Sequence, residues 1–166
     1  MKTLVFLAPG FEETEAVAVI DLLRRAKVDV LLVSVGAGDF VTSARGISIK
    51  TDLPIEQVKD SEDADLLFLP GGMPGSENLG KSERLGELLK EQKNRGKWIA
   101  AVCAAPTVLE KHGLLAGEKV TSHPSVVADL KSAASYSTDK VVVSGKMSCA
   151  GKSSSCGQSS YRSPPL

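Results

Sequence analysis

The sequence is short of cysteine, of net charge and of long apolar runs. Its 166 residues include 3 cysteines, and 20 Lys and Arg balance 20 Asp and Glu. An odd and low number of cysteines excludes a disulfide framework and favours a reducing, cytoplasmic compartment. Zero net charge gives no electrostatic reason to expect nucleic acid or an acidic membrane as a partner. No stretch approaches the roughly 20 apolar residues that cross a bilayer, so we expect no membrane segment.

Short apolar runs alternate with helical patterns along the chain. The runs are continuous, as expected for strands that are covered on both faces, and occupy residues 3–8, 28–35, 65–70, 97–103 and 140–144. Apolar residues recur at helical spacing in residues 14–27 and 82–96. Strands that alternate with helices predict an α/β fold in which helices cover a mostly parallel sheet.

The segment from Lys146 onward has a different composition. It contains seven serines, and its only Val, Ile or Leu is the final Leu166. Such a segment predicts neither a strand nor an apolar helix face. We therefore expect one α/β domain over residues 1–145, followed by a disordered Ser-rich tail over residues 146–166.

The main candidate for chemistry is Cys103, in the stretch IAAVCAAPT. It follows a predicted strand and precedes a predicted helix that Pro106 fits as a first-turn residue. A thiol at a helix start lies near free N–H groups and the positive end of the helix dipole, which lower a cysteine pKa. Ligands also bind at the carboxyl ends of strands in open α/β sheets. Cys103 is either small buried filler or a nucleophile at a strained turn, and its position alone does not decide.

Three carboxylates are predicted at the same edge of the sheet. Glu12, Glu13 and Glu15 follow the first strand and begin the first helix, so one of them could exchange a proton with Cys103. Acids in a first helical turn also complement the helix dipole, which is the interpretation we favour for Glu12 and Glu13. Spacing by itself does not single out Glu15.

Two glycine motifs follow the strand at residues 65–70. Gly71 and Gly72 allow close backbone approach, so their N–H groups are candidates for an oxyanion hole, although Gly-Gly is also an ordinary turn signal. Residues 75–82, GSENLGKS, match the phosphate-loop pattern. However, the motif does not start at the strand exit and Glu77 places a negative charge in the loop, so we do not expect nucleotide binding.

The histidines and the other cysteines give weaker signals. His112 precedes a glycine near a helix end, where a cation meets the last carbonyls, and we interpret it as structural. His123 follows a short predicted strand and either assists a cysteine nucleophile or is a structural loop residue. Cys149 and Cys156 have no accompanying set of ligands, so we expect no zinc site.

Five motifs together resemble the ThiJ/PfpI superfamily, and within it the Parkinson-disease-associated deglycase group (the DJ-one branch and its bacterial relatives). They are LAPGFEETEAV, DLLRRA, LLFLPGGMPGSENL, WIAAVCAAPTVL and KVTSHPSV, within residues 2–145. The resemblance implies a flavodoxin-like three-layer sandwich, usually a homodimer, with no cofactor. Ala104 stands where PfpI-type peptidases carry histidine. The glycine-flanked cysteine and the His-x-Glu pair of glutamine amidotransferases are also missing, which argues against both relatives.

The resemblance also implies roles for individual residues. Cys103 matches the reactive, oxidisable cysteine, Glu15 the acid hydrogen-bonded to it, and His123 a nearby histidine. Positions that match the backbone oxyanion site and basic residues near it are Gly71, Gly72, Ala104, Arg25 and Arg45. The implied activity converts methylglyoxal and glyoxal to 2-hydroxy acids and repairs early glycation adducts on protein or nucleotide groups. The alternatives are a non-catalytic redox sensor or chaperone that uses the same cysteine, or a destabilised, truncated form with little activity.

The end of the sequence departs from the family pattern. The family continues with a last strand, an Arg-Gly-Pro-Gly turn and a long apolar C-terminal helix, and we expect this chain to lack both the strand and the helix. A bare sheet edge and the lost apolar burial predict lower stability than that of longer relatives, and leave the dimer in doubt. Relatives are also found in the nucleus and in mitochondria.

Overall fold

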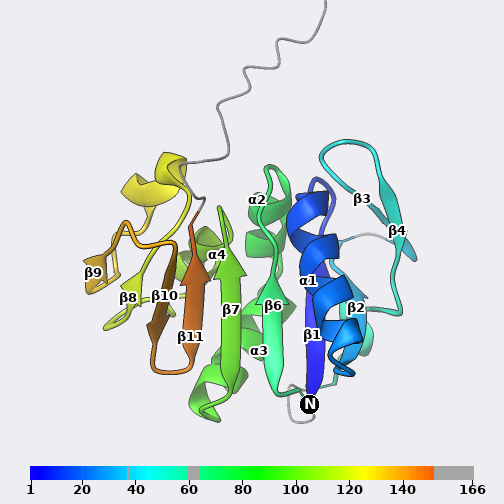
Figure 1. Ribbon diagram of the computed structural model, residues 1–166, viewed down its shortest axis with the longest axis horizontal. Coiled ribbons are helices and arrows are strands. Elements are labelled where there is room, and N and C mark those ends of the chain that lie inside the picture. Colours follow the sequence, from blue (N-terminus) through cyan, green and yellow to red (C-terminus); the bar gives the residue numbers. More distant parts are fainter. Residues whose placement is uncertain (37, 60–63, 152–166) are drawn as a thin grey trace, which may run out of the picture.

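The main sheet of the protein lies between two helical layers. The computed structural model describes residues 1–36, 38–59 and 64–151 (Figure 1). Neighbouring strands pair in parallel except β10 and β11, which are antiparallel. Across the sheet, the order is β10 (Val141–Ser144), β11 (Met147–Ala150), β7 (Trp98–Val102), β6 (Leu66–Leu69), β1 (Lys2–Leu7), β2 (Asp29–Ser34) and β5 (Leu53–Pro54). The predicted α/β class and mostly parallel sheet are confirmed.

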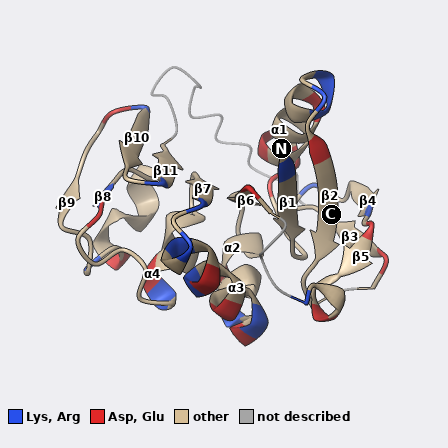
Figure 2. Cartoon of the chain, turned by 90° about the horizontal axis from the view of Figure 1, so that it is seen from below, with Lys and Arg blue, Asp and Glu red and all other residues tan. Residues whose placement is uncertain are grey.

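Helices lie on both faces of this sheet, as Figure 2 shows. Helix α1 (Glu13–Arg25) covers one face. The opposite face is covered by α2 (Gly75–Lys81), α3 (Glu83–Asn94) and α4 (Pro106–Lys111). Successive side chains of a strand point to opposite faces, so alternate residues of β1 enter two separate apolar cores. Burial on both faces is the physical reason for the continuous apolar runs.

Smaller elements lie around the main sheet. Strands β3 (Phe40–Thr42) and β4 (Ser48–Lys50) form an antiparallel pair. Strands β8 (Lys119–Val120) and β9 (Ser135–Tyr136) form a parallel one. Two short 3₁₀ helices, η1 and η2, span Ile55–Gln57 and Pro124–Asp129. Among the described residues, the helices are all too short or too polar to cross a membrane.

Strand β11 corrects the prediction that no strand follows Lys146. Met147 and Cys149 are buried, while Ser148 and Ala150 face the other side of the sheet and are half-buried. The composition argument failed because strand pairing is made by backbone groups, and a buried Met and Cys suffice on the inner face. The predicted tail over residues 152–166, the missing C-terminal helix and Cys156 lie outside the described residues.

One part of the sheet face on the α1 side is open. Val141 and Val143 of β10 point to this side and are 57% and 59% exposed. Val102 of β7 and Ala150 of β11 pair on the same side and are only half-buried. Within the described part of the chain, α1 is the helix on this side, and it lies over β1 and β2 (Figures 1 and 2). The apolar surface next to the end of β7 is therefore accessible.

Candidate active site

Cys103 occupies a strained turn directly after β7. Its φ is 57°, in the left-handed region that residues with a side chain rarely adopt. Its N–H donates to the carbonyl of Ala150 at 2.8 Å, and its carbonyl accepts from the N–H of His123 at 2.7 Å. The side chain is half-buried. The strained turn predicted for Cys103 is therefore present, and its side chain is not fully buried.

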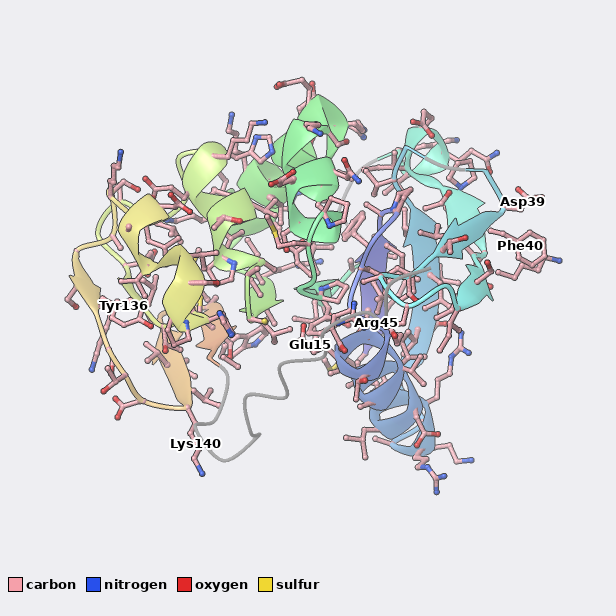
Figure 3. All side chains as sticks on the ribbon, turned by 90° about the horizontal axis from the view of Figure 1, so that it is seen from above. Glu15, Asp39, Phe40, Arg45, Tyr136 and Lys140 are labelled. Atoms are coloured by element: carbon pink, nitrogen blue, oxygen red, sulfur yellow. The ribbon has the colours of Figure 1, made fainter. Side chains whose placement is uncertain are left out.

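Glu15 is the carboxylate that reaches this turn. Helix α1 is capped by Glu12, whose side chain accepts from the N–H of Glu15 at 2.7 Å, so the capping interpretation of Glu12 is correct. The Glu15 carboxylate accepts from the N–H of Gly71 at 2.9 Å. It is also hydrogen-bonded to the side chain of Cys103. Figure 3 shows Glu15 at the centre of the edge where the parallel strands end.

Gly71 lies between the carboxylate and the thiol. A Cβ at this position would lie 2.6 Å from Oε2 of Glu15 and 2.7 Å from Cβ of Cys103. The N–H of Gly71, a predicted oxyanion donor, donates to Glu15 in this structure and thereby positions the acid. Gly72 has a φ of 96° and packs against the backbone of Phe11. The amides of Gly72 and Ala104 remain the oxyanion candidates.

The predicted low pKa of Cys103 is also wrong. Burial of the thiol, the charge of Glu15 and the hydrogen bond to Glu15 together raise the pKa of Cys103 to about 12, although the N–H of Ala104 acts in the opposite direction. The helix dipole does not give the thiol a lowered pKa, because α4 is short and begins only at Pro106. The Glu15 carboxylate, by contrast, contacts the thiol directly and raises its pKa. Apart from burial, Glu15 is therefore the main influence on the acidity of this thiol.

His123 reaches the site through its backbone. Its N–H donates to the carbonyl of Cys103, but Nδ1 of its ring is 2.7 Å from Oγ of Ser125 and accepts from the Ser125 N–H at 3.2 Å. These contacts cap the 3₁₀ helix η2. In this structure His123 holds the turn at Cys103, which fits the structural alternative rather than a Cys–His pair.

The two arginines lie at different distances from the site. Arg25 is in the last turn of α1, ten residues or about 15 Å along the helix from Glu15, and pairs with Asp21 at 2.8 Å. The prediction that Arg25 lies near the site is therefore wrong for this chain. The loop before Arg45 is tied to the β1–α1 loop, because the N–H of Ala44 donates to the carbonyl of Phe11. Figure 3 shows Arg45 on the same edge as Glu15.

The remaining candidate motifs have structural roles. Residues 75–81 form helix α2 rather than a phosphate loop. His112 is buried against Gly86 of α3, and burial lowers its pKa, so it is a neutral core residue and not the helix-end cation that we predicted. Over residues 1–36, 38–59 and 64–151, His, Cys, Asp and Glu side chains form no group of three that could hold a metal ion.

A cavity of about 210 Å³ opens beside Cys103 and Glu15. Ala18 and Val19 of α1 form one wall, and Val102, Ala150 and Gly151 form the other. This cavity was not predicted from the sequence, because its second wall depends on β11. The only signal was the pair of small residues at the end of that strand.

These features define an α/β sandwich protein with a cysteine–glutamate pair at the carboxyl edge of its parallel sheet. The model of the DJ-1/PfpI family matches residues 1–156, and the chain belongs to this family. The match continues beyond residue 145, where the resemblance was expected to end.

Individual relatives agree with this assignment. Protein dj-1beta of Drosophila melanogaster is 44% identical over 142 residues, which are 86% of this chain and 75% of the relative. The structure of oxidized Toxoplasma gondii DJ-1 has a TM-score of 0.83 at 40% identity, and covers 91% of this chain and 82% of its own. A Caenorhabditis elegans relative named glutathione-independent glyoxalase DJR-1.2 is 36% identical over 148 residues, 88% of this chain and 77% of that protein.

Proposed function

We propose that this protein is a cofactor-independent glyoxalase and deglycase. Its substrates are 2-oxoaldehydes such as methylglyoxal and glyoxal, which it converts to 2-hydroxy acids, and early glycation adducts that present the same carbonyl chemistry. The observation that carries the proposal is the hydrogen-bonded contact between Cys103 and Glu15. The name of the Caenorhabditis elegans relative, a glutathione-independent glyoxalase, supports it.

The first step is attack of the Cys103 sulfur on the aldehyde carbon. The raised pKa of the thiol favours its neutral form, so we infer that it gives its proton to Glu15 only as the S–C bond forms. Negative charge develops on the aldehyde oxygen, where the N–H groups of Gly72 and Ala104 are the candidate donors. Glu15 then passes the proton to that oxygen, which leaves a neutral hemithioacetal and an ionised carboxylate.

The second step moves a proton between the two substrate carbons. The Glu15 carboxylate removes the proton from the former aldehyde carbon and returns it to the adjacent carbon. The hydroxyl proton of the hemithioacetal passes to the keto oxygen, so the keto group becomes a hydroxyl and the former aldehyde carbon becomes the thioester carbonyl. The product is a thioester of the 2-hydroxy acid on Cys103. Water cleaves the thioester, restoring the thiol and releasing the acid. One water is consumed overall, and no electron acceptor is needed.

The proposal is tested by replacing the nucleophile. Cys103→Ser is expected to abolish the formation of lactate from methylglyoxal, measured by chromatography of the product. Cys149→Ser is the matched control, because Cys149 is a buried cysteine that packs in the core on the opposite face. Near-normal lactate formation by Cys103→Ser would show that another group performs the chemistry.

A second candidate is redox sensing through the same sulfur. It is favoured by the Toxoplasma gondii relative, whose structure is described as oxidized. Titration with hydrogen peroxide followed by mass spectrometry, beside the methylglyoxal assay, separates the two functions. Oxidation of Cys103 without turnover would favour the sensor.

A further inference from the structure

The cavity beside Cys103 has one polar side and one apolar side. Glu15 and Cys103 form the polar side, where the proposed chemistry takes place. Away from them, the side chains that line the cavity are small and apolar: Ala18, Val19, Val102 and Ala150. A substrate bonded to the Cys103 sulfur therefore has an apolar space within reach of its next atoms.

The size of this space suits a substituent larger than methyl. The cavity measures about 210 Å³, whereas a dry apolar cavity of about 150 Å³ in another protein binds benzene. Its apolar side chains would give the hydroxyls of a sugar-derived substituent no hydrogen-bond partners, and unpartnered polar groups are costly to bury. The walls favour a hydrocarbon group over a polyhydroxylated one.

We propose that this cavity is the subsite for the substituent on the keto carbon, and that the protein prefers 2-oxoaldehydes with a propyl or phenyl group over methylglyoxal. The inference rests on the proposed function. In this arrangement the aldehyde oxygen points toward the amides of Gly72 and Ala104, and the substituent lies between α1 and the ends of β7 and β11. Ala18, near the mouth of the cavity, is the specificity-determining position.

The experiment measures kcat/KM for glyoxal, methylglyoxal, 2-oxopentanal and phenylglyoxal. Burial of each added methylene is expected to raise kcat/KM by up to about fourfold. Hydration differs between these aldehydes, so the diagnostic quantity is the change that Ala18→Leu causes for each one. This variant partly fills the cavity and is expected to lower the phenylglyoxal to methylglyoxal ratio of kcat/KM by roughly tenfold.

Ala26→Leu is the matched control, since Ala26 is the exposed C-cap at the far end of α1. Both substitutions keep a good helix former, and Ala26→Leu should leave the substrate ratio within about twofold of the unsubstituted protein. If Ala18→Leu leaves the ratio unchanged, the subsite is overturned while the proposed function stands.

A binding measurement separates failure of the subsite from failure of the chemistry. Lactate and mandelate are the products of methylglyoxal and phenylglyoxal, and each is tested for protection of Cys103 against iodoacetamide. Better protection by mandelate, lost in Ala18→Leu, supports the apolar subsite even if no aldehyde is turned over, in which case only the proposed function fails. Equal protection without any turnover would overturn both.

Discussion

The N–H of Gly71 donates to Oε2 of Glu15 at 2.9 Å, and there is no room for a side chain at residue 71 between this carboxylate and Cys103. The acid is therefore oriented by a backbone group of a neighbouring strand exit. Glu15 itself comes from the first turn of α1. The start of α1, the turn after β6 and the turn after β7 therefore meet at the hydrogen bond between Glu15 and Cys103. In the proposed mechanism, the position of the proton in this bond decides whether the sulfur is a nucleophile.

Gly71→Ala is expected to lower the turnover of methylglyoxal by about 100-fold or more, since its Cβ would push the carboxylate away from the thiol and misplacement by about 1 Å has that effect. Gly80→Ala is the control. Its Cβ would approach only the flexible end of the Lys111 side chain, at 3.3 Å. Turnover is compared at equal folded content, judged by circular dichroism. Equal turnover by the two variants would contradict the positioning role of Gly71.

Glu15→Gln should separate the acidity of Cys103 from its catalytic use. Removing the carboxylate charge is expected to lower the pKa of the Cys103 thiol from about 12, because that charge is the largest cause after burial. Turnover is nevertheless expected to fall by about 100- to 10,000-fold, since the proton carrier is lost. The rate of alkylation by iodoacetamide as a function of pH measures the first effect. An unchanged pH profile would show that Glu15 does not control the thiol.

Acidification is expected to destabilise the protein through His112. Burial lowers the pKa of His112 below its ordinary 6.5, and the charges of Lys90 and Lys111 lower it further against that of Glu83. Below about pH 6.5 the unfolded chain therefore binds a proton that the folded chain does not, so the free energy of unfolding falls as the pH falls.

Urea unfolding at pH 7.5 and 5.5 measures this loss of stability. His112→Leu should reduce the difference between the two pH values, because it removes the titrating ring from the core. His123→Gln is the matched control and should keep the difference, since the His123 ring lies at the surface beside Ser125. An equal pH dependence in all three proteins would contradict the assignment to His112.

The packing of β11 predicts a stability difference between adjacent residues. Met147 is 4% exposed and lies in the core on the α4 side, so Met147→Ala is expected to lower the free energy of unfolding by about 2–5 kcal/mol. Ser148 points to the open side, and Ser148→Ala should change it by less than about 0.5 kcal/mol. Chemical denaturation of the two variants makes the comparison. Similar values would mean that this strand is not packed as described.

Much of the fold could be predicted because strands that are buried on both faces have continuous apolar runs in their sequence. The apolar runs at residues 3–8 and 97–103 correspond to β1 and β7. Strand β11, with the sequence MSCA, has no such apolar run. Its pairing uses backbone groups, and its inward residues, Met147 and Cys149, are not the β-branched types on which a composition argument depends.

The site could be predicted in part. A strand-to-helix junction marked Cys103, and the family resemblance singled out Glu15 where spacing did not. The sign of the thiol pKa shift could not be predicted, because it depends on how closely the Glu15 carboxylate approaches the sulfur. For Arg25, the position in the last turn of α1 overrides the expectation carried over from relatives.

The hydrogen bond from the Cys103 N–H to the Ala150 carbonyl links the turn that carries the thiol to the end of β11. Strand β11 is held by its hairpin with β10, its pairing with β7 and the burial of Met147 and Cys149. If β11 separates from the sheet, the turn that holds the sulfur loses one of its two backbone anchors, and the bond from the His123 N–H to the Cys103 carbonyl is left. The proposed turnover of methylglyoxal is therefore expected to depend on β11, and should fade on heating before the helical signal does.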